Sequence, residues 1–89
     1  AGVLMSSPRG DHSEYIAFMR RGLRALARRV GDADSEDLAE MLTLRDELDV
    51  AIATAVQGVR RSGFSWSDIG RATGMTRQSA HGRWASGAP

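Results

Sequence analysis

The side chains best suited to specific hydrogen bonding lie together near the end of the sequence, just after a glycine. They are Thr76, Arg77, Gln78 and His81. Arginine carries a planar fork of donors that matches O6 and N7 of guanine, and glutamine pairs similarly with N6 and N7 of adenine. A threonine hydroxyl at the start of a helix also suits a phosphate. On a helix that enters a major groove, these side chains would face DNA base edges, and the plain alternative is a set of solvated surface side chains.

A second group of basic and hydroxyl side chains flanks the first. Its members are Arg60, Arg61, Ser65, Arg71 and Arg83. Side chains of these types bond to the phosphates of a nucleic acid, which set affinity and its dependence on salt but carry no sequence information. We therefore expect these five residues to contact the DNA backbone.

Residue patterns for catalysis are missing from the sequence. There is no cysteine, and the two histidines, His12 and His81, lie far apart. No paired carboxylates, nucleophile–base pair, metal-ligand spacing or phosphate-binding glycine loop can be recognised. We therefore expect that the protein is not an enzyme and that it binds no metal, cofactor or small-molecule substrate.

The elements that must position the first group are two short helices. Ser65 and Asp68 have the spacing of a capping box that opens one helix, and Gly74 suits the left-handed residue that ends it. Thr76 then caps the last helix. Two short helices joined through a glycine are typical of a helix-turn-helix, which is predicted here at 64–85.

Apolar residues of the two short helices are predicted to point into a core. Ile69 and Ala72 are the inward residues of the first helix, and Ala80 and Trp84 are those of the second. Trp66 is also expected in the core, because its spacing fits helix packing better than stacking on single-stranded bases.

Two longer helices are predicted upstream, the second of them long, which makes the fold class all-α. Apolar residues recur at three- and four-residue spacing over 15–30 and again over 38–59. Residues 1–12 contain glycine, serine and proline without periodicity and are predicted to be a disordered lead-in. The remainder, 13–89, is predicted to form a single domain.

Short polar residues are expected to cap both upstream helices. Asp11 or Ser13 would cap the first, and Asp34 or Ser35 would cap the second, which runs to about Arg61. Four apolar residues of this long helix are expected in the core or in a dimer interface, namely Leu42, Leu48, Ile52 and Val56. The near-heptad spacing suits packing on the first helix and a helix–helix dimer equally well.

The distribution of charge is more informative than its sum. The 89 residues carry a net charge of +1, and all twelve basic residues are arginine. The net charge is +4 over 1–30, −7 over 31–57 and +4 over 58–89. A near-neutral total argues against a nucleic-acid binder, but the basic final third coincides with the predicted helix-turn-helix.

The stretch GFSWSDIGRATGMTRQSAHGRW resembles the helix-turn-helix of many small actinobacterial and phage DNA-binding proteins, and its pattern is similar to region four of sigma factors. The preceding LRDELDVAIATAVQGVRRSG resembles the long helix that often leads into this motif. The residues that carry the resemblance are Ser65-Trp66, Asp68-Ile69-Gly70, Gly74 to Gln78 and Arg83-Trp84.

The resemblance implies binding of double-stranded DNA, either sequence-specific or of the nucleoid type, and a role in transcription regulation as a homodimer. The alternative is a protein-interaction module that docks on the transcription machinery, or on a phage or host partner, through the acidic long helix. The sequence has no apolar run near the ~20 residues of a membrane span and no recognisable signal peptide. A cytoplasmic protein of the nucleoid is therefore expected.

Overall fold

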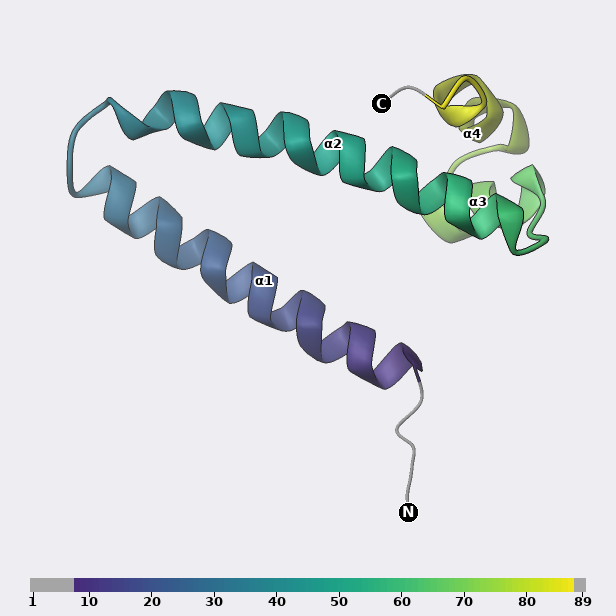
Figure 1. The fold of residues 1–89 in the computed structure, drawn as a ribbon, viewed down its shortest axis with the longest axis horizontal. Helices are drawn as coiled ribbons and strands as arrows, with labels where there is room; N and C mark the ends of the chain where they lie inside the picture. Colours follow the sequence, from purple (N-terminus) through teal and green to yellow (C-terminus); the bar gives the residue numbers. More distant parts are fainter. Residues whose placement is uncertain (1–7, 88–89) are drawn as a thin grey trace, which may run out of the picture. The chain divides into compact units, whose positions relative to one another are not determined.

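The computed structural model describes residues 8–87, which form α-helices joined by short turns and contain no strand (Figure 1). The helices are α1 (Pro8–Gly31), α2 (Asp37–Arg61), α3 (Trp66–Thr73) and α4 (Arg77–Trp84). The all-α class is confirmed, with two long helices followed by two short ones. No helix among these residues is long and apolar enough to cross a membrane.

The start of α1 differs from the prediction. The helix begins at Pro8, so residues 8–12 are helical where a disordered lead-in was predicted, while 1–7 lie outside the described residues. Proline suits the first turn because it has no N–H to leave unpaired and its φ angle is already helical. Asp11 and Ser13 lie inside the helix, so the prediction that one of them caps it was wrong.

The turn between α1 and α2 is set by an aspartate. The Oδ1 atom of Asp34 accepts a hydrogen bond of 3.0 Å from the backbone N–H of Glu36. This local turn precedes α2, which begins at Asp37. The prediction that Asp34 or Ser35 caps α2 stays a prediction.

The chain divides into two compact units, with the boundary between Leu38 and Ala39. The single domain over 13–89 stays a prediction. In the first unit, Val30 is buried, but most large apolar side chains of α1 are half-exposed or more. A single helix with its turn has no facing element within the unit, and it therefore cannot enclose its own apolar side. These exposed residues are Tyr15, Ile16, Phe18, Met19 and Leu23.

The second unit has a core where α3 and α4 meet the C-terminal half of α2 (Figure 1). Trp66 and Met75 pack against its edge. A hydrogen bond of 2.8 Å from Nε2 of Gln57 to the backbone oxygen of Trp84 ties the end of α4 to α2. The core residues are Ala53, Val56, Ile69, Ala80 and Trp84.

Burial confirms part of the predicted core. Ile69, Ala80 and Trp84 are buried, whereas Ala72 is exposed. Trp66 is only half-buried, because it stands at the first position of α3, at the rim of the core.

The four apolar residues of α2 that were predicted for the core or a dimer interface differ in burial. Val56 is buried, and Leu42, Leu48 and Ile52 are exposed. The three exposed residues therefore do not belong to the core of either unit. Their expected place in a dimer interface stays a prediction.

Candidate nucleic-acid interface

The first helix of the predicted helix-turn-helix, α3, opens with the predicted capping box. Ser65 has extended backbone angles, and its Oγ accepts a bond of 3.1 Å from the N–H of Asp68. The N–H of Ser65 donates in return to Oδ2 of Asp68 at 2.8 Å. Two backbone donors at the helix start are thereby satisfied, and the Ser65 hydroxyl keeps a proton that it can donate to a phosphate.

The Asp68 carboxylate also holds one of the predicted backbone-contacting arginines. Nη2 of Arg71 donates to Oδ1 of Asp68 at 2.5 Å. The hydrogen bonds from Ser65, followed by the charge and hydrogen bond of Arg71, hold the pKa of Asp68 below its ordinary value. A phosphate would therefore compete with Asp68 for the guanidinium of Arg71.

The turn between α3 and α4 depends on two glycines. Gly74 has a φ of 73°, in the left-handed region that favours glycine. A Cβ atom on Gly70 would lie 2.7 Å from the backbone oxygen of Met75 and 3.0 Å from that of Thr76. The turn thus approaches α3 too closely for any side chain at position 70, and this approach fixes the position of α4 against α3.

The start of α4 is capped by Thr76, as predicted. Its Oγ1 accepts a bond of 3.0 Å from the N–H of Ser79 and donates to Oγ of Ser79 at 2.9 Å. Both the proton and one lone pair of the hydroxyl are engaged within the helix. A contact of the Thr76 hydroxyl with DNA would have to replace or share the bond to Ser79.

The structure places the other three predicted base-contacting residues on the exposed side of α4. Ala80 and Trp84 are buried, while Arg77, Gln78 and His81 are exposed. Within residues 8–87, neither Arg77 nor Gln78 makes a side-chain hydrogen bond or an ion pair. Both therefore keep all their donors for a ligand, including the fork that would recognise guanine or adenine.

Trp66 brings together two residues that the sequence analysis assigned to different roles. The Cζ atom of Arg60 lies 5.0 Å from the centroid of the Trp66 ring, in cation–π geometry. The ring centroid of His81 lies 5.4 Å from that of Trp66, with an interplanar angle of 76°. The sequence analysis missed this cluster, and the only signal for it was an aromatic first residue of α3 close behind a basic helix end.

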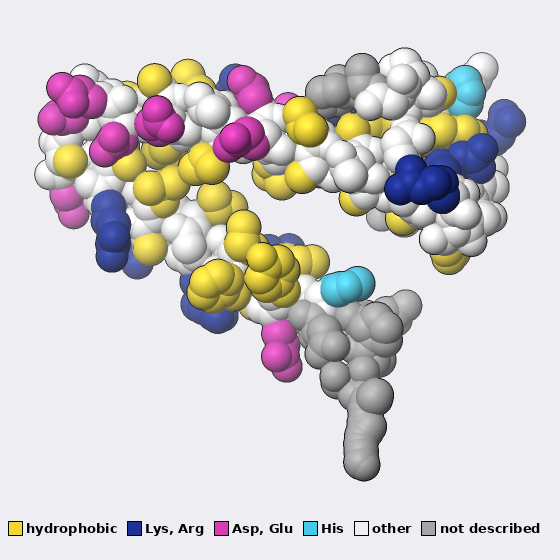
Figure 2. Space-filling model, in the orientation of Figure 1, with side chains coloured by type: hydrophobic (Ala, Val, Ile, Leu, Met, Phe, Trp, Pro, Cys, Tyr) yellow, Lys and Arg dark blue, Asp and Glu magenta, His cyan; other side chains and the backbone are white. Residues whose placement is uncertain are grey.

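The remaining predicted backbone-contacting arginines lie at the ends of α2 and α4. Arg61 is exposed in the last turn of α2. The Cζ atom of Arg83 lies 5.6 Å from the centroid of the Trp84 ring, so its stem covers the edge of the core. In the second unit, basic side chains gather at the end that holds α3 and α4, and acidic ones over the N-terminal half of α2 (Figure 2).

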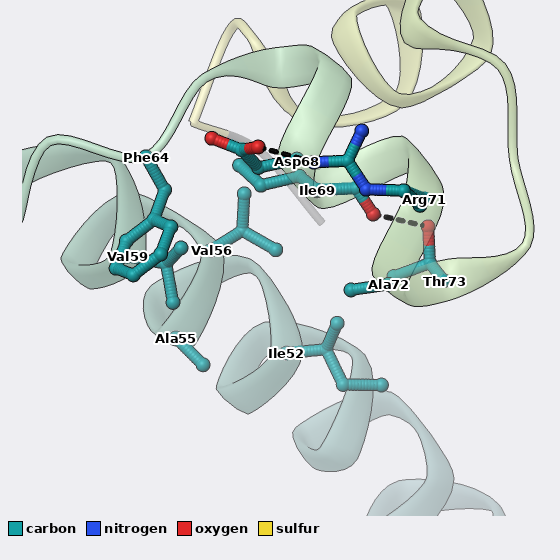
Figure 3. Close-up of a pocket in the computed structure, with 10 residues that line it drawn as sticks. All are labelled: Ile52, Ala55, Val56, Val59, Phe64, Asp68, Ile69, Arg71, Ala72 and Thr73. Atoms are coloured by element: carbon teal, nitrogen blue, oxygen red, sulfur yellow. Dashed lines mark hydrogen bonds and ion pairs between the residues drawn. The ribbon is translucent and has the colours of Figure 1, made fainter.

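An apolar groove of about 590 Å³ lies between the C-terminal half of α2 and α3 (Figure 3). Asp68 and Arg71 form part of its wall. Its apolar lining is Ile52, Ala55, Val56, Val59, Phe64, Ile69 and Ala72. The groove was not predicted, and it explains why Ala72 remains exposed.

Among the described residues there is no group of three or more acidic or histidine side chains that could hold a metal ion. Comparisons of the chain with models of protein families, with curated proteins and with solved structures gave no match.

Proposed function

We propose that the protein binds double-stranded DNA through the helix-turn-helix formed by α3 and α4. The observation that carries this proposal is the two-sided character of α4. One side is locked into the core by Ala80 and Trp84, and the other presents Arg77 and Gln78 without partners among the described residues. A capped, rigidly held helix with unengaged forked donors in its first turn is suited to reading base edges.

The size of α4 agrees with this role. An α-helix with its side chains is about 10–12 Å in diameter, which fits the ~12 Å width of the major groove. The eight residues of α4 span about 12 Å along the helix axis. In a helix-turn-helix, the N-terminal residues of the second helix face the bases. Arg77 and Gln78 are the first two residues of α4. Arg77 would accordingly select guanine and Gln78 adenine.

The affinity would come largely from the backbone contacts. Arg83 belongs to α4, and Arg60 and Arg61 lie in the last turn of α2, with Arg60 over the Trp66 ring. None of the three makes an ion pair with a described residue. Each phosphate that they neutralise releases counterions, which makes binding weaken as salt rises. Arg71 contributes less in this proposal, because Asp68 already neutralises it.

A second copy of the chain would supply a second half-site, and we propose a homodimer built from α1 and α2. Among the described residues of these helices, twelve large apolar side chains are 39–67% exposed. A stable interface buries about 800 Å² on each partner, and these exposed side chains supply apolar surface for it. An unpaired monomer rarely exposes so much apolar surface.

Charge complementarity supports pairing of α1 from one copy with α2 from the other. The sequence of α1 contains six arginines and two acidic residues. From Asp37 to Asp49, the N-terminal half of α2 contains five acidic residues and one arginine. Two such pairs form a four-helix bundle in which each apolar side is covered and opposite charges meet. A dimer of this kind would act in the nucleoid as a transcription regulator or as an architectural protein.

A titration with duplex DNA tests the proposed function. We expect an electrophoretic shift at micromolar protein in ~50 mM salt, with clear weakening at ~200 mM. A sharp preference for one selected sequence over random DNA would favour a regulator, and uniform binding would favour a nucleoid protein. The absence of a shift at micromolar protein in low salt would contradict DNA binding.

The exposed apolar and acidic side of α2 also favours a second candidate, a module that docks on the transcription machinery. This candidate predicts binding to purified RNA polymerase that is lost on Leu48→Asp, together with no affinity for duplex DNA. Binding of DNA without any binding of polymerase would exclude it.

A further inference from the structure

Three side chains from three helices form a cluster at the edge of the proposed helix-turn-helix. The indole ring of Trp66 lies at its centre, and Arg60 and His81 contact this ring. Arg60 lies in the last turn of α2, Trp66 begins α3, and His81 lies in the middle of α4. The Arg60 guanidinium carbon and the His81 ring centroid lie 5.0 and 5.4 Å from the centre of the indole ring. The indole thus connects the last turn of α2 to the helix that is proposed to enter the major groove.

Two interactions hold the guanidinium of Arg60 in place. Its Nη1 donates a bond of 2.8 Å to the backbone oxygen of Phe64, and its guanidinium lies over the Trp66 ring. Neither partner carries a negative charge, so the positive charge of Arg60 stays uncompensated by the described residues. The guanidinium has five donors, and the bond to Phe64 uses one of them. A pre-oriented cation with spare donors is suited to a phosphate, because little side-chain entropy remains to be lost on binding.

His81 extends this arrangement toward the bases. It follows Arg77 by four residues on α4, so the two side chains lie on the same side of the helix. Its ring is packed edge-to-face with Trp66, which draws it toward the start of α3. The ring still carries an N–H that can donate to an anionic oxygen.

We propose that Trp66 aligns Arg60 and His81 as one binding site for the phosphodiester backbone of the DNA strand beside α4. This inference rests on the proposed function and deepens it in two respects. It moves His81 from base reading to backbone contact, and it makes Trp66 a positioning residue that acts through its two neighbours. Base reading is then left to Arg77 and Gln78.

Affinity measurements on a panel of duplexes that differ only in sequence test the site. We expect Arg60→Ala and His81→Ala each to weaken binding about threefold to tenfold, by a similar factor on every duplex. Arg60→Ala should also lower the slope of log affinity against log salt by about one. Arg45→Ala is the matched control, because it removes an exposed arginine of α2 far along the sequence from the cluster, and we expect no change.

The positioning role of Trp66 is tested by a double-mutant cycle. Trp66→Leu should weaken DNA binding in the wild-type background and have little further effect in an Arg60→Ala, His81→Ala background. Trp66→Phe should restore most of the affinity, since it keeps an aromatic face. Thermal melting of each variant shows whether it is folded, and a purely structural role of Trp66 would weaken binding equally in both backgrounds.

The outcomes separate the two proposals. The inference is overturned if Arg60→Ala and His81→Ala leave affinity and salt slope unchanged while Arg77→Ala relaxes base preference, and the proposed function then stands. It is also overturned if His81→Ala changes which bases are preferred. A wild-type protein that binds no duplex in low salt overturns both proposals.

Discussion

The C-terminal and N-terminal parts of this chain use apolar residues in opposite ways. Around α3 and α4, a few apolar side chains close a small core with the end of α2. Along α1 and the first half of α2, similar side chains recur at helical spacing, but most remain exposed. The first part is closed by local caps and by close packing of its own side chains. The second leaves its apolar side chains exposed, and our proposals accordingly assign DNA binding to the first part and association to the second.

The largest expected effect comes from breaking the closed core. Trp84→Ala should lower the free energy of unfolding by about 3–5 kcal/mol, because Trp84 is only 5% exposed. At a concentration low enough to keep the protein monomeric, Tyr15→Ala in α1 should cost less than about 1 kcal/mol, since Tyr15 is 67% exposed in the single chain. Chemical denaturation measures both values. Equal losses for the two variants would contradict the contrast between the two parts.

A smaller loss of stability is expected at Gly70, where α3 lies close to the backbone of the turn that precedes α4. Gly70→Ala should destabilise the protein by about 1–3 kcal/mol, because the new Cβ atom would meet the backbone of Met75 and Thr76. Gly22→Ala in α1 is the matched control, since its Cβ atom would meet nothing within 4 Å. That variant should gain up to about 1 kcal/mol from helix propensity. Thermal melting of the two variants in parallel should give shifts of opposite sign.

Introducing a charged residue into the exposed apolar side of α2 tests whether this side forms the proposed dimer interface. Leu48 is 55% exposed, so Leu48→Asp should leave the helical circular dichroism nearly unchanged and convert a dimer into a monomer. Thr43→Asp adds the same charge at an exposed position on another side of α2 and should keep the dimer. Light scattering measures the mass. A wild-type protein that is already monomeric at micromolar concentration would remove the proposed dimer.

The smallest effect expected is the pH dependence of the α3 cap. The pKa of Asp68 is lower in the folded chain than in the unfolded one, owing to its bonds with Ser65 and Arg71. Its contribution to stability is therefore present above the ordinary aspartate pKa of about 3.9 and is lost as pH falls through the lower folded value. Asp68→Asn should melt at a lower temperature than the wild type at pH 7, and the difference should shrink toward pH 3. A constant difference between the two melting temperatures would contradict this account.

The two short helices α3 and α4 were predictable because their signals are local. The capping box of Ser65 and Asp68, the left-handed Gly74 and the cap at Thr76 each involve residues within a few positions of one another. The start of α1 was missed because Pro8 lies among residues without apolar periodicity, and a proline marks a helix start as readily as a break.

Contacts between residues far apart in the sequence could not be predicted from sequence patterns. The apolar residues of α2 share one spacing, yet Val56 is buried and Leu48 exposed, because α3 and α4 cover only the end of the helix. The contact of Trp66 with His81 joins residues fifteen positions apart across a turn. Helical spacing gives the side on which each residue lies but not the tertiary partner that it meets.

The measurement that tests the central claim most directly is a titration of isotope-labelled protein with a duplex, followed by nuclear magnetic resonance. We predict that the largest shift changes fall on Arg77, Gln78 and His81 and on the indole N–H of Trp66. The signals of α1 should move little. Changes concentrated in α1 or in the acidic half of α2, or no changes at millimolar duplex in low salt, would contradict the assignment of DNA binding to α4.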